Sequence, residues 1–541
     1  MELGILIGVS RTVPVRSLRQ PRQAGPGLGL RRWLPGPDSA WWIGLVAAAF
    51  TATQLAFVSA RLGLSWDEVV YVSQVSGHAP AAYFDPARAR GVPLLVAPVA
   101  LLTSSVTALR VYLSVASGAG LFGALMAWRR LRPAWVIALA GVCFGGLWVA
   151  QYYGPQAMPD LWVALAAVAA VGLFLRVAAR RDDPPGGSLG SADRSPSEVG
   201  LPATAGTRWP WALLAGLAGC VGAAALIRPG DAIFLAAPLV ASVIAVPRWR
   251  RWPLAVAVIA GLVAGGAEWV AEAYLRFGGP LARLHAAGAE QGGFGLHLAV
   301  WAELRSLNGP TLCRPCTVGW RHPELALWWL ALPGLVALGI FAARRAGRLG
   351  TALLPAGCGC CAAAQYLFLI DYAAPRFLLP AYGLLALPVA DGLGWLVTRV
   401  RADLRPLARL AVAFCLAAEL AAQHVVLEHE VAGTVTFHDD YAHIVADLRA
   451  LGVRPPCLIR GQQYIPVAFY AGCASAPGPA GADRVAVLEY PGVRRPRYAR
   501  DWPRHRLPGT RVLRLVGYIR PRLARTKTQR PPSRITSGAS A

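Results

Sequence analysis

Long hydrophobic stretches recur along most of this chain and alternate with shorter polar segments. A helix needs about 20 consecutive, mostly apolar residues to cross a bilayer. Eleven stretches approach that length, at residues 41–60, 106–128, 133–153, 161–178, 209–227, 231–247, 252–274, 326–343, 350–370, 376–397 and 407–426. The pattern therefore predicts a polytopic α-helical membrane protein with about eleven spans, over residues 41–426.

Hydropathy falls after Gln423, and the pattern of apolar positions changes with it. Helix, strand, helix and strand are expected in turn at residues 441–453, 457–460, 464–472 and 484–490. Such alternation predicts a small α/β domain over 427–520. The Gly-, Pro- and Ser-rich segment 182–207 is typical of a flexible linker, and residues 521–541 of a disordered tail.

Arginines mark one side of the predicted bundle. Short loops rich in Arg or Lys stay in the cytoplasm, whereas translocated loops have fewer of them. Every second connection is basic, beginning with residues 1–40 and continuing at Arg129 to Arg132, Arg176 to Arg181, Arg248 to Arg251, Arg344 to Arg348 and Arg399 to Arg409. The sequence thus predicts a multi-pass protein of the cell membrane with a cytoplasmic N-terminus. Loops 61–105 and 275–325 and the α/β domain are then extracytoplasmic.

The composition excludes some classes of function. The formal net charge is +25, yet only 15% of residues are charged and 55% are hydrophobic. Much of the positive charge lies in the cytoplasmic loops, and no basic strip is interleaved with aromatic residues in a soluble domain. We therefore expect membrane lipids, and no nucleic acid, among the partners.

Several motifs follow one another in the membrane region. They are SWDEVVY at 65–71, GVPLLVAPVALL with the span that follows it from Gly91, QYYGPQAMPD at 151–160, LIRPGD at 226–231 and APRFLLPAYGLLALP at 374–388. As an ordered set, over about residues 41–400, they resemble the glycosyltransferase C superfamily, in its branch of protein O-mannosyltransferases and aminoarabinose transferases. The chain departs from that family at Gly91 and Val92, where His-Pro is common, and at Arg228, where lysine is common.

This resemblance implies an enzyme that transfers a sugar on the outer face of the membrane. The donor would be a polyprenyl-phosphate sugar, with a hydrophobic groove for the lipid chain. The acceptor would be a glycan, a lipid or a protein. A multi-span transporter is the alternative, together with a lipid-binding or scaffold protein without catalysis. Transport predicts polar sites at the membrane midplane, whereas the notable acids here gather near one face.

Asp67 and Glu68 are the candidate catalytic residues. An acceptor hydroxyl that attacks an anomeric carbon needs a base, and a carboxylate can supply it. Ser65 and Glu68 have the spacing of a capping box, so Glu68 has a structural alternative. In a helix that begins here, Asp67, Tyr71, Gln74 and His78 would form one polar stripe, and Tyr71 would contact the substrate. An interfacial helix with solvated polar residues is the other interpretation.

Two arginines are candidates for binding the donor phosphate. Arg228 and Arg376 lie at predicted outer ends of spans, against the positive-inside trend, and a guanidinium binds phosphate through two parallel hydrogen bonds. Snorkelling to lipid headgroups is the alternative. Asp160 begins a span after Pro159, so it could bind substrate or stabilise the helix N-terminus.

Two further acids lie near the outer end of the seventh span. Glu268 and Glu272 are one helical turn apart, followed by Arg276. Glu268 is a candidate substrate-binding residue, and Glu272 fits better in a structural salt bridge. The sequence indicates no cofactor and no metal site, although a divalent cation between carboxylates stays open.

The ten cysteines divide by position. Six lie within predicted spans, where a thiol behaves as a small hydrophobic group. Cys313 and Cys316 form a CRPC motif in the second outer loop, and Cys457 and Cys473 flank a helix of the α/β domain. We expect disulfides at these four positions in an oxidising compartment, with a redox or zinc role of CRPC as the alternative.

Overall fold

The computed structural model describes residues 38–179, 210–475 and 484–521, together with Gly36 and apart from positions 294, 310, 315, 318, 320 and 321. Almost all of the basic segment 1–40, the linker 182–207 and nearly all of the tail 521–541 lie outside the described residues. Expectations about these three segments therefore stay predictions.

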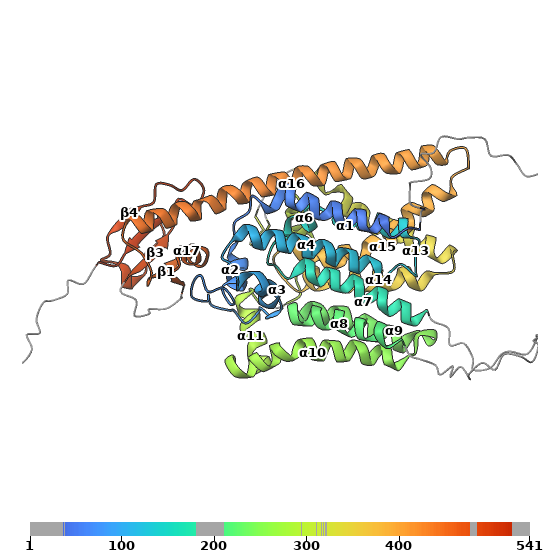
Figure 1. Cartoon of the computed structure of the whole chain (residues 1–541), viewed down its shortest axis with the longest axis horizontal. Helices are drawn as coiled ribbons and strands as arrows, with labels where there is room; N and C mark the ends of the chain where they lie inside the picture. Colours follow the sequence, from blue (N-terminus) through green and yellow to red (C-terminus); the bar gives the residue numbers. More distant parts are fainter. Residues whose placement is uncertain are drawn as a thin grey trace, which may run out of the picture. The chain divides into compact units, whose positions relative to one another are not determined.

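Eleven helices coincide with the eleven predicted segments (Figure 1). They are α1 (Trp41–Gln54, extended by η2, Leu55–Ser59), α4 (Val106–Met126), α5 (Ala134–Gly145), α7 (Asp160–Ala178), α8 (Trp211–Ile227), α9 (Pro229–Ala245), α10 (Trp252–Arg276), α13 (Leu327–Arg345), α14 (Leu349–Phe368), α15 (Leu379–Arg399) and α16 (Arg405–Ala450). Within the described residues, eight helical segments are long and apolar enough to cross a membrane, while α5, α8 and α9 are shorter. The chain is a polytopic helical membrane protein; eleven spans stays a prediction.

Short elements connect these helices. They are α2 (Trp66–Val72), α3 (Gly91–Ala100), α6 (Trp148–Tyr153), α11 (Pro280–Glu290), α12 (Val300–Ser306), and the 3-10 turns η3 (Pro247–Trp249), η4 (Pro323–Ala326) and η5 (Pro375–Leu378). The predicted span 133–153 is thus divided between α5 and α6, because the backbone of Leu147 is extended.

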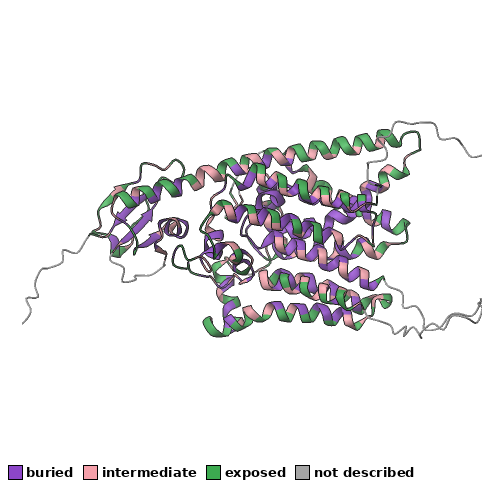
Figure 2. Ribbon diagram, in the orientation of Figure 1, coloured by how far each residue is buried: buried purple, intermediate pink, exposed green. Residues whose placement is uncertain are grey.

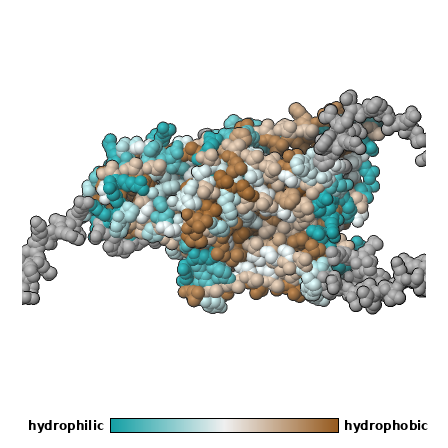
Figure 3. Space-filling view, viewed as in Figure 1, coloured by the Kyte–Doolittle hydropathy of each residue, from teal (hydrophilic) through white to brown (hydrophobic). Residues whose placement is uncertain are grey.

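Helix α16 runs along the edge of the bundle (Figure 2), whereas α15 is the most buried of the long apolar helices among the described residues. In the most apolar window of each helix, 94% of residues are buried in α15 and 17% in α16. Close packing depends on small residues: a Cβ on Gly265 of α10 would meet the carbonyl oxygen of Gly222 of α8 at 2.0 Å. Such contacts between small residues let membrane helices approach each other. Hydrophobic surface covers the helices between more hydrophilic regions at the two ends (Figure 3).

The C-terminal domain is a small α/β unit, as predicted. Its sheet has the order β2-β1-β3-β5-β4, in which β1 is parallel to β2 and β3 and β5 is antiparallel to β3 and β4. The elements are β1 (Leu458–Gly461), α17 (Tyr464–Ala471), β2 (Ala474–Ser475), β3 (Val485–Glu489), η6 (Arg497–Ala499), β4 (Arg504–Arg506) and β5 (Val516–Ile519). Helix α16 runs without a break from the bundle into this domain, so the predicted boundary at residue 427 falls inside a helix.

Three helices fix where the two ends of the bundle lie. Helix α7 begins at Asp160, α9 begins just after Arg228, and α14 ends shortly before Arg376. The helices run 17 to 20 residues from there to their other ends. At about 1.5 Å per residue, residues at opposite ends are roughly 25–30 Å apart, which is the thickness of the hydrocarbon core.

Candidate active site at one end of the helices

A cavity of about 390 Å³ lies where α2, α7, α9 and η5 meet. We call it the polar cavity. Five of the candidate residues lie close together in its wall: Asp67, Tyr71, Asp160, Arg228 and Arg376. Its other charged residues are Asp85, Arg88, Glu290 and Arg314. Four guanidinium groups therefore face four carboxylates, contributed by segments that lie far apart in the sequence.

Asp67 occupies the first turn of α2, which Ser65 and Glu68 close as the predicted capping box. Its carboxylate accepts a hydrogen bond of 2.7 Å from Arg88 and one of 3.3 Å from Arg376. Burial raises the pKa of the Asp67 carboxyl, but Arg88 and Arg376 outweigh burial and hold this pKa below its usual value. Asp67 is thus an ionised carboxylate between two guanidinium groups, with 32% of its side chain exposed to the cavity.

Arg228 and Arg376 both contact Asp160, which is buried at the first position of α7. Arg228 donates to one carboxylate oxygen, and the Nε of Arg376 lies 3.5 Å from the other. The rings of Tyr366 and Phe377 face the Arg228 guanidinium at 5.3 and 4.8 Å. These contacts hold two cations side by side in the wall, a geometry suited to a dianionic phosphate.

Glu68 has a different environment from its neighbour. It is fully buried, lies outside the polar cavity, and accepts hydrogen bonds from both terminal nitrogens of Arg110. Its carboxylate also accepts from the backbone N–H of Ser65 at 3.0 Å and of Ala157 at 2.8 Å. Arg110 itself donates to the carbonyl oxygens of Leu62, Gly63 and Pro155. This geometry favours the structural role of Glu68, because its oxygens are already occupied.

The polar stripe expected after Asp67 is shorter than predicted. Helix α2 ends at Val72, because the Ser73 hydroxyl donates to Val70 and accepts from the N–H of Ala82, which folds the chain back. Tyr71 remains on the helix and lines the polar cavity. Gln74 lies beyond it and receives a hydrogen bond of 2.9 Å from Arg90, while the His78 ring packs on Phe469.

Glu268 and Glu272 line none of the cavities described here. Glu272 accepts hydrogen bonds from Arg90 at 2.6 Å and from Arg283 at 2.9 Å, which agrees with the structural salt bridge expected for it. Glu268 has one buried carboxylate oxygen without a hydrogen-bond partner among the described residues. Its assignment to substrate binding therefore has no support from the shape of the site.

Several residues of the polar cavity were not singled out from the sequence, among them Arg88, Arg314 and Tyr372. Arg88 forms the shortest contact to Asp67 and also pairs with Asp85. The sequence did offer a reason to select Arg88: it is a cation in a predicted outer loop, against the positive-inside trend, as Arg228 is. The same reason was available for Arg314, a cation in the outer loop 275–325, whose guanidinium lies 5.0 Å from the Tyr372 ring.

The CRPC segment is hydrogen-bonded to the stretch of chain just before Arg376. Cys313 and Cys316 form a disulfide, and Cys313 pairs with Ala373 through backbone hydrogen bonds of 2.9 and 3.3 Å. Glu303, fully buried on α12, accepts from the N–H of Ala374 at 3.3 Å. Burial raises the pKa of Glu303 to about 8.

A second disulfide joins Cys457 and Cys473, whose Cα atoms are 4.8 Å apart, at the two ends of the segment that contains β1 and α17.

A second cavity, of about 890 Å³, adjoins the polar cavity. We call it the α16 cavity. It shares Trp66 and Leu312 with the polar cavity. Aromatic rings and neutral hydrogen-bonding groups dominate the rest of its wall, which includes Tyr152, Asn308, Thr434, Phe437, Tyr441 and Gln463. The two cavities therefore meet at Trp66 and Leu312.

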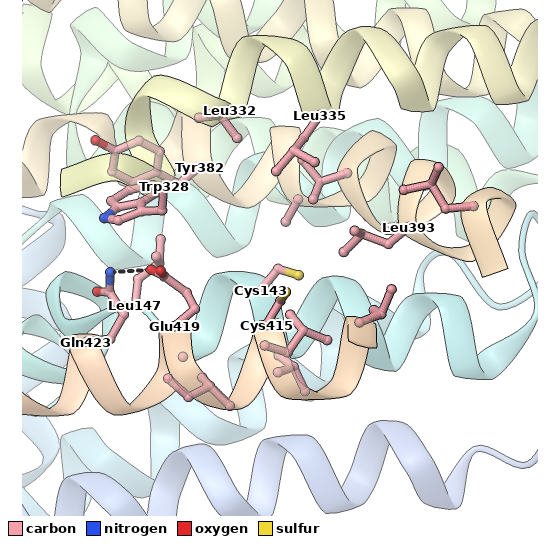
Figure 4. Close-up of a pocket in the computed structure, with 18 of the residues that line it drawn as sticks. Cys143, Leu147, Trp328, Leu332, Leu335, Tyr382, Leu393, Cys415, Glu419 and Gln423 are labelled. Carbon is pink, nitrogen blue, oxygen red and sulfur yellow. Dashed lines mark hydrogen bonds between the residues drawn. The ribbon is translucent and has the colours of Figure 1, made fainter. Parts of the chain in front are cut away.

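An apolar groove of about 460 Å³ runs between α5, α13, α15 and α16 (Figure 4). Apolar side chains, among them leucines, Cys143 and Cys415, line most of it, and Glu419, which accepts from Gln423 at 2.8 Å, lies at one end. Its lining suits a hydrocarbon chain. However, it shares no residue with the polar cavity, so the structure does not identify it as the lipid groove of the same site.

Among the described residues, no group of three or more His, Cys, Asp or Glu side chains is arranged to hold a metal ion. The carboxylates of the polar cavity face arginines instead. A divalent cation between carboxylates stays an open alternative.

No protein-family model matches the sequence, and no curated protein matches it significantly. Among solved structures, ArnT from Cupriavidus metallidurans bound to undecaprenyl phosphate has a TM-score of 0.60 at 13% identity, covering 89% of this chain and 98% of that chain. Its apo state has a TM-score of 0.58 at 14% identity, covering 88% and 98%.

The archaeal oligosaccharyltransferase AglB from Archaeoglobus fulgidus, in complex with an inhibitory peptide and a dolichol-phosphate, has a TM-score of 0.50 at 12% identity. That alignment covers 81% of this chain and 64% of that chain. The protein therefore has the glycosyltransferase C fold that its motifs predict. At these identities the likeness establishes the fold, and the chemistry has to be argued from the site.

Proposed function

We propose that this protein is a membrane glycosyltransferase that moves a sugar from a polyprenyl-phosphate donor to an acceptor hydroxyl. The observation that carries the proposal is the polar cavity, in which Asp67 lies beside Arg228 and Arg376 at the end of the bundle. The fold supports it, because two proteins that share this fold were solved with undecaprenyl phosphate and with a dolichol-phosphate.

In the proposed reaction, the acceptor oxygen attacks the anomeric carbon while the bond from that carbon to the phosphate oxygen breaks. Asp67 takes the hydroxyl proton, and the polyprenyl phosphate leaves with the electron pair. Arg228 and Arg376 offset the charge that develops on the phosphate. A phosphate that engages Arg376 would also draw this cation from Asp67 and so raise the basicity of the carboxylate. Donor binding would thereby prepare the base.

The acceptor side of the reaction is assigned to the α16 cavity. Its aromatic and amide side chains suit a hydroxyl-bearing acceptor, and its shared wall with the polar cavity would bring the hydroxyl next to the donor. Glycan, lipid and protein acceptors all offer such a hydroxyl.

The orientation predicted from the arginines places both cavities outside the cytoplasm. Supporting this, the arginine-rich connections lie at the opposite ends of α7, α9 and α14 from the polar cavity. Reporter fusions at Ala432 and Ala541 test it: both should report an extracytoplasmic position, and a cytoplasmic signal at both would reverse the assignment.

Profiling of lipid-linked sugars in cells with and without this protein tests the function. We expect one polyprenyl phosphosugar to accumulate when the protein is absent or when Asp67→Asn replaces it. Identical profiles in all three strains would reject the proposal.

A further inference from the structure

A third cavity, of about 1140 Å³, lies at the end of the bundle opposite the polar cavity. We call it the arginine cavity. The C-terminal ends of α7 and α9, the turn η3 and the start of α14 surround it. The proposed transfer reaction uses none of these residues, and the cavity shares no lining residue with the polar cavity.

The wall of this cavity is amphiphilic, with its charge at one end. Arg248, Arg251 and Arg348 line it, and no Asp or Glu is among the described lining residues. Arg248 is exposed on η3, and Arg348 precedes the first residue of α14. Trp249 lies beside them, and its ring contacts that of Phe174 at 6.1 Å. Tryptophan and arginine together are typical of the level of lipid headgroups.

Away from the arginines the lining becomes apolar. It includes Pro238 of α9 and Leu353, Leu354 and Gly357 of α14. Gly357 lies eight residues along α14 from Leu349, a distance of about 12 Å at the helical rise. The cavity therefore extends from the arginine level into the hydrocarbon region, the path of a headgroup followed by the first part of an acyl chain.

We infer that the arginine cavity binds an anionic phospholipid, with the phosphate at Arg248 and Arg348 and one acyl chain along α14. Charge decides the class of lipid. Asp391 lies 3.5 Å from Arg348, but its carboxylate is shared with Arg132, so it offsets only one of these two cations. Together with Arg248 this leaves a net positive charge, which favours a headgroup with net negative charge over a zwitterionic one. Arg251 contributes charge and also closes the end of α7, since it donates to the carbonyl oxygen of Val177 at 3.2 Å.

The experiment compares lipid retention by the full-length protein. Native mass spectrometry would measure bound phosphatidylglycerol and phosphatidylcholine after purification from nanodiscs that contain both in equal amounts. We expect selective retention of phosphatidylglycerol, and a decrease of about 10- to 30-fold in Arg248→Ala/Arg348→Ala, at roughly a tenfold factor or less per cation. The matched control is Arg344→Ala/Arg345→Ala, which removes two charges from the same end without touching the cavity.

A second variant tests the acyl-chain path without changing charge. A Cβ on Gly357 meets no atom within 4 Å, so the ring of Gly357→Phe projects into open space and blocks the apolar part of the arginine cavity. We expect it to reduce retention as strongly as the double arginine variant. Gly334→Phe, on α13, is the control, because its Cβ also meets nothing and it lines none of these cavities.

Three outcomes would overturn the inference: wild-type protein without preference for phosphatidylglycerol, equal loss in the control variants, or retention that appears only after residues 186–206 are deleted. The last would show that the chain's own linker fills the cavity. The test does not depend on the proposed transferase activity, since lipid retention is measured without substrate.

Discussion

The two ends of the bundle both hold arginines, but in opposite electrostatic settings. In the polar cavity Arg88, Arg228 and Arg376 are all paired with carboxylates. In the arginine cavity three guanidinium groups line the wall, no carboxylate is among the described lining residues, and Asp391 behind Arg348 is shared with Arg132. Paired cations are held in fixed positions and suit a reaction that needs defined geometry. An excess of cations over carboxylates suits the retention of an anion, so the same residue type serves two purposes.

The largest effect is expected from Asp67, whose role defines the polar cavity. Asp67→Asn keeps the shape of the side chain and loses the base, so transfer should fall by about 10² to 10⁴. The protein should stay folded, because the side chain is only partly buried. Initial rates of sugar transfer and the melting temperature of the purified variant would be measured together.

Glu68 provides the matched comparison at the adjacent position. Glu68→Gln leaves the buried Arg110 without its counter-ion, and breaking such a pair costs about 3–5 kcal/mol. We therefore expect a lower melting temperature and a poor yield of folded protein. A stable Glu68→Gln protein without activity would move the base from Asp67 to Glu68.

The next effect concerns the arginines that would bind the phosphate. A hydrogen bond to a charged group contributes about 1.5–3 kcal/mol, so Arg376→Ala should raise the KM for the donor by about 10- to 150-fold. Arg376→Lys keeps the charge and should retain more affinity than the alanine variant. The same order is expected at Arg228. Unchanged donor KM in both alanine variants would favour snorkelling instead.

These residues show how much of the site the sequence could reveal. Asp67, Arg228 and Arg376 stood out because their charges conflict with their positions beside apolar spans. The pairing of Asp67 with Arg376 spans 309 positions in the chain and depends on how α2 and η5 meet. The eleven helices were predicted because hydrophobic length alone specifies them. Strands β2 and β4, of two and three residues, are too short to produce a readable alternation.

A smaller, pH-dependent effect is expected at Glu303, whose carboxyl accepts a hydrogen bond from the backbone N–H of Ala374, close to Arg376. Its pKa of about 8 in the folded protein exceeds that of an unfolded carboxyl. The folded state then binds more protons, so stability should fall as pH rises from about 5 through 8. Glu303→Gln mimics the neutral acid and should flatten this dependence. The measurement is the melting temperature of both proteins from pH 5 to 9. If Glu303 were already ionised throughout this range, both proteins would show the same dependence on pH.

The smallest effect is expected in the arginine cavity, where an added carboxylate tests whether charge selects the lipid. Thr351→Asp adds a carboxylate to the arginine cavity next to Arg348, and an acid in the first turn of α14 is compatible with its helix. Retention of phosphatidylglycerol should fall about fivefold, as one positive charge is offset. Thr351→Val is the control of similar size. Equal retention by both would mean that charge does not select the lipid.

Transfer by the purified protein tests the central claim most directly. Wild-type protein and Asp67→Asn would be reconstituted with the polyprenyl phosphosugar that accumulates in cells lacking the protein, together with a membrane extract as the acceptor. Mass spectrometry would follow the release of free polyprenyl phosphate. We predict release by the wild-type protein and at least a hundredfold slower release by Asp67→Asn, within the range of about 10² to 10⁴ for a lost base. Equal release by both proteins, or none by the wild-type protein, would contradict the account.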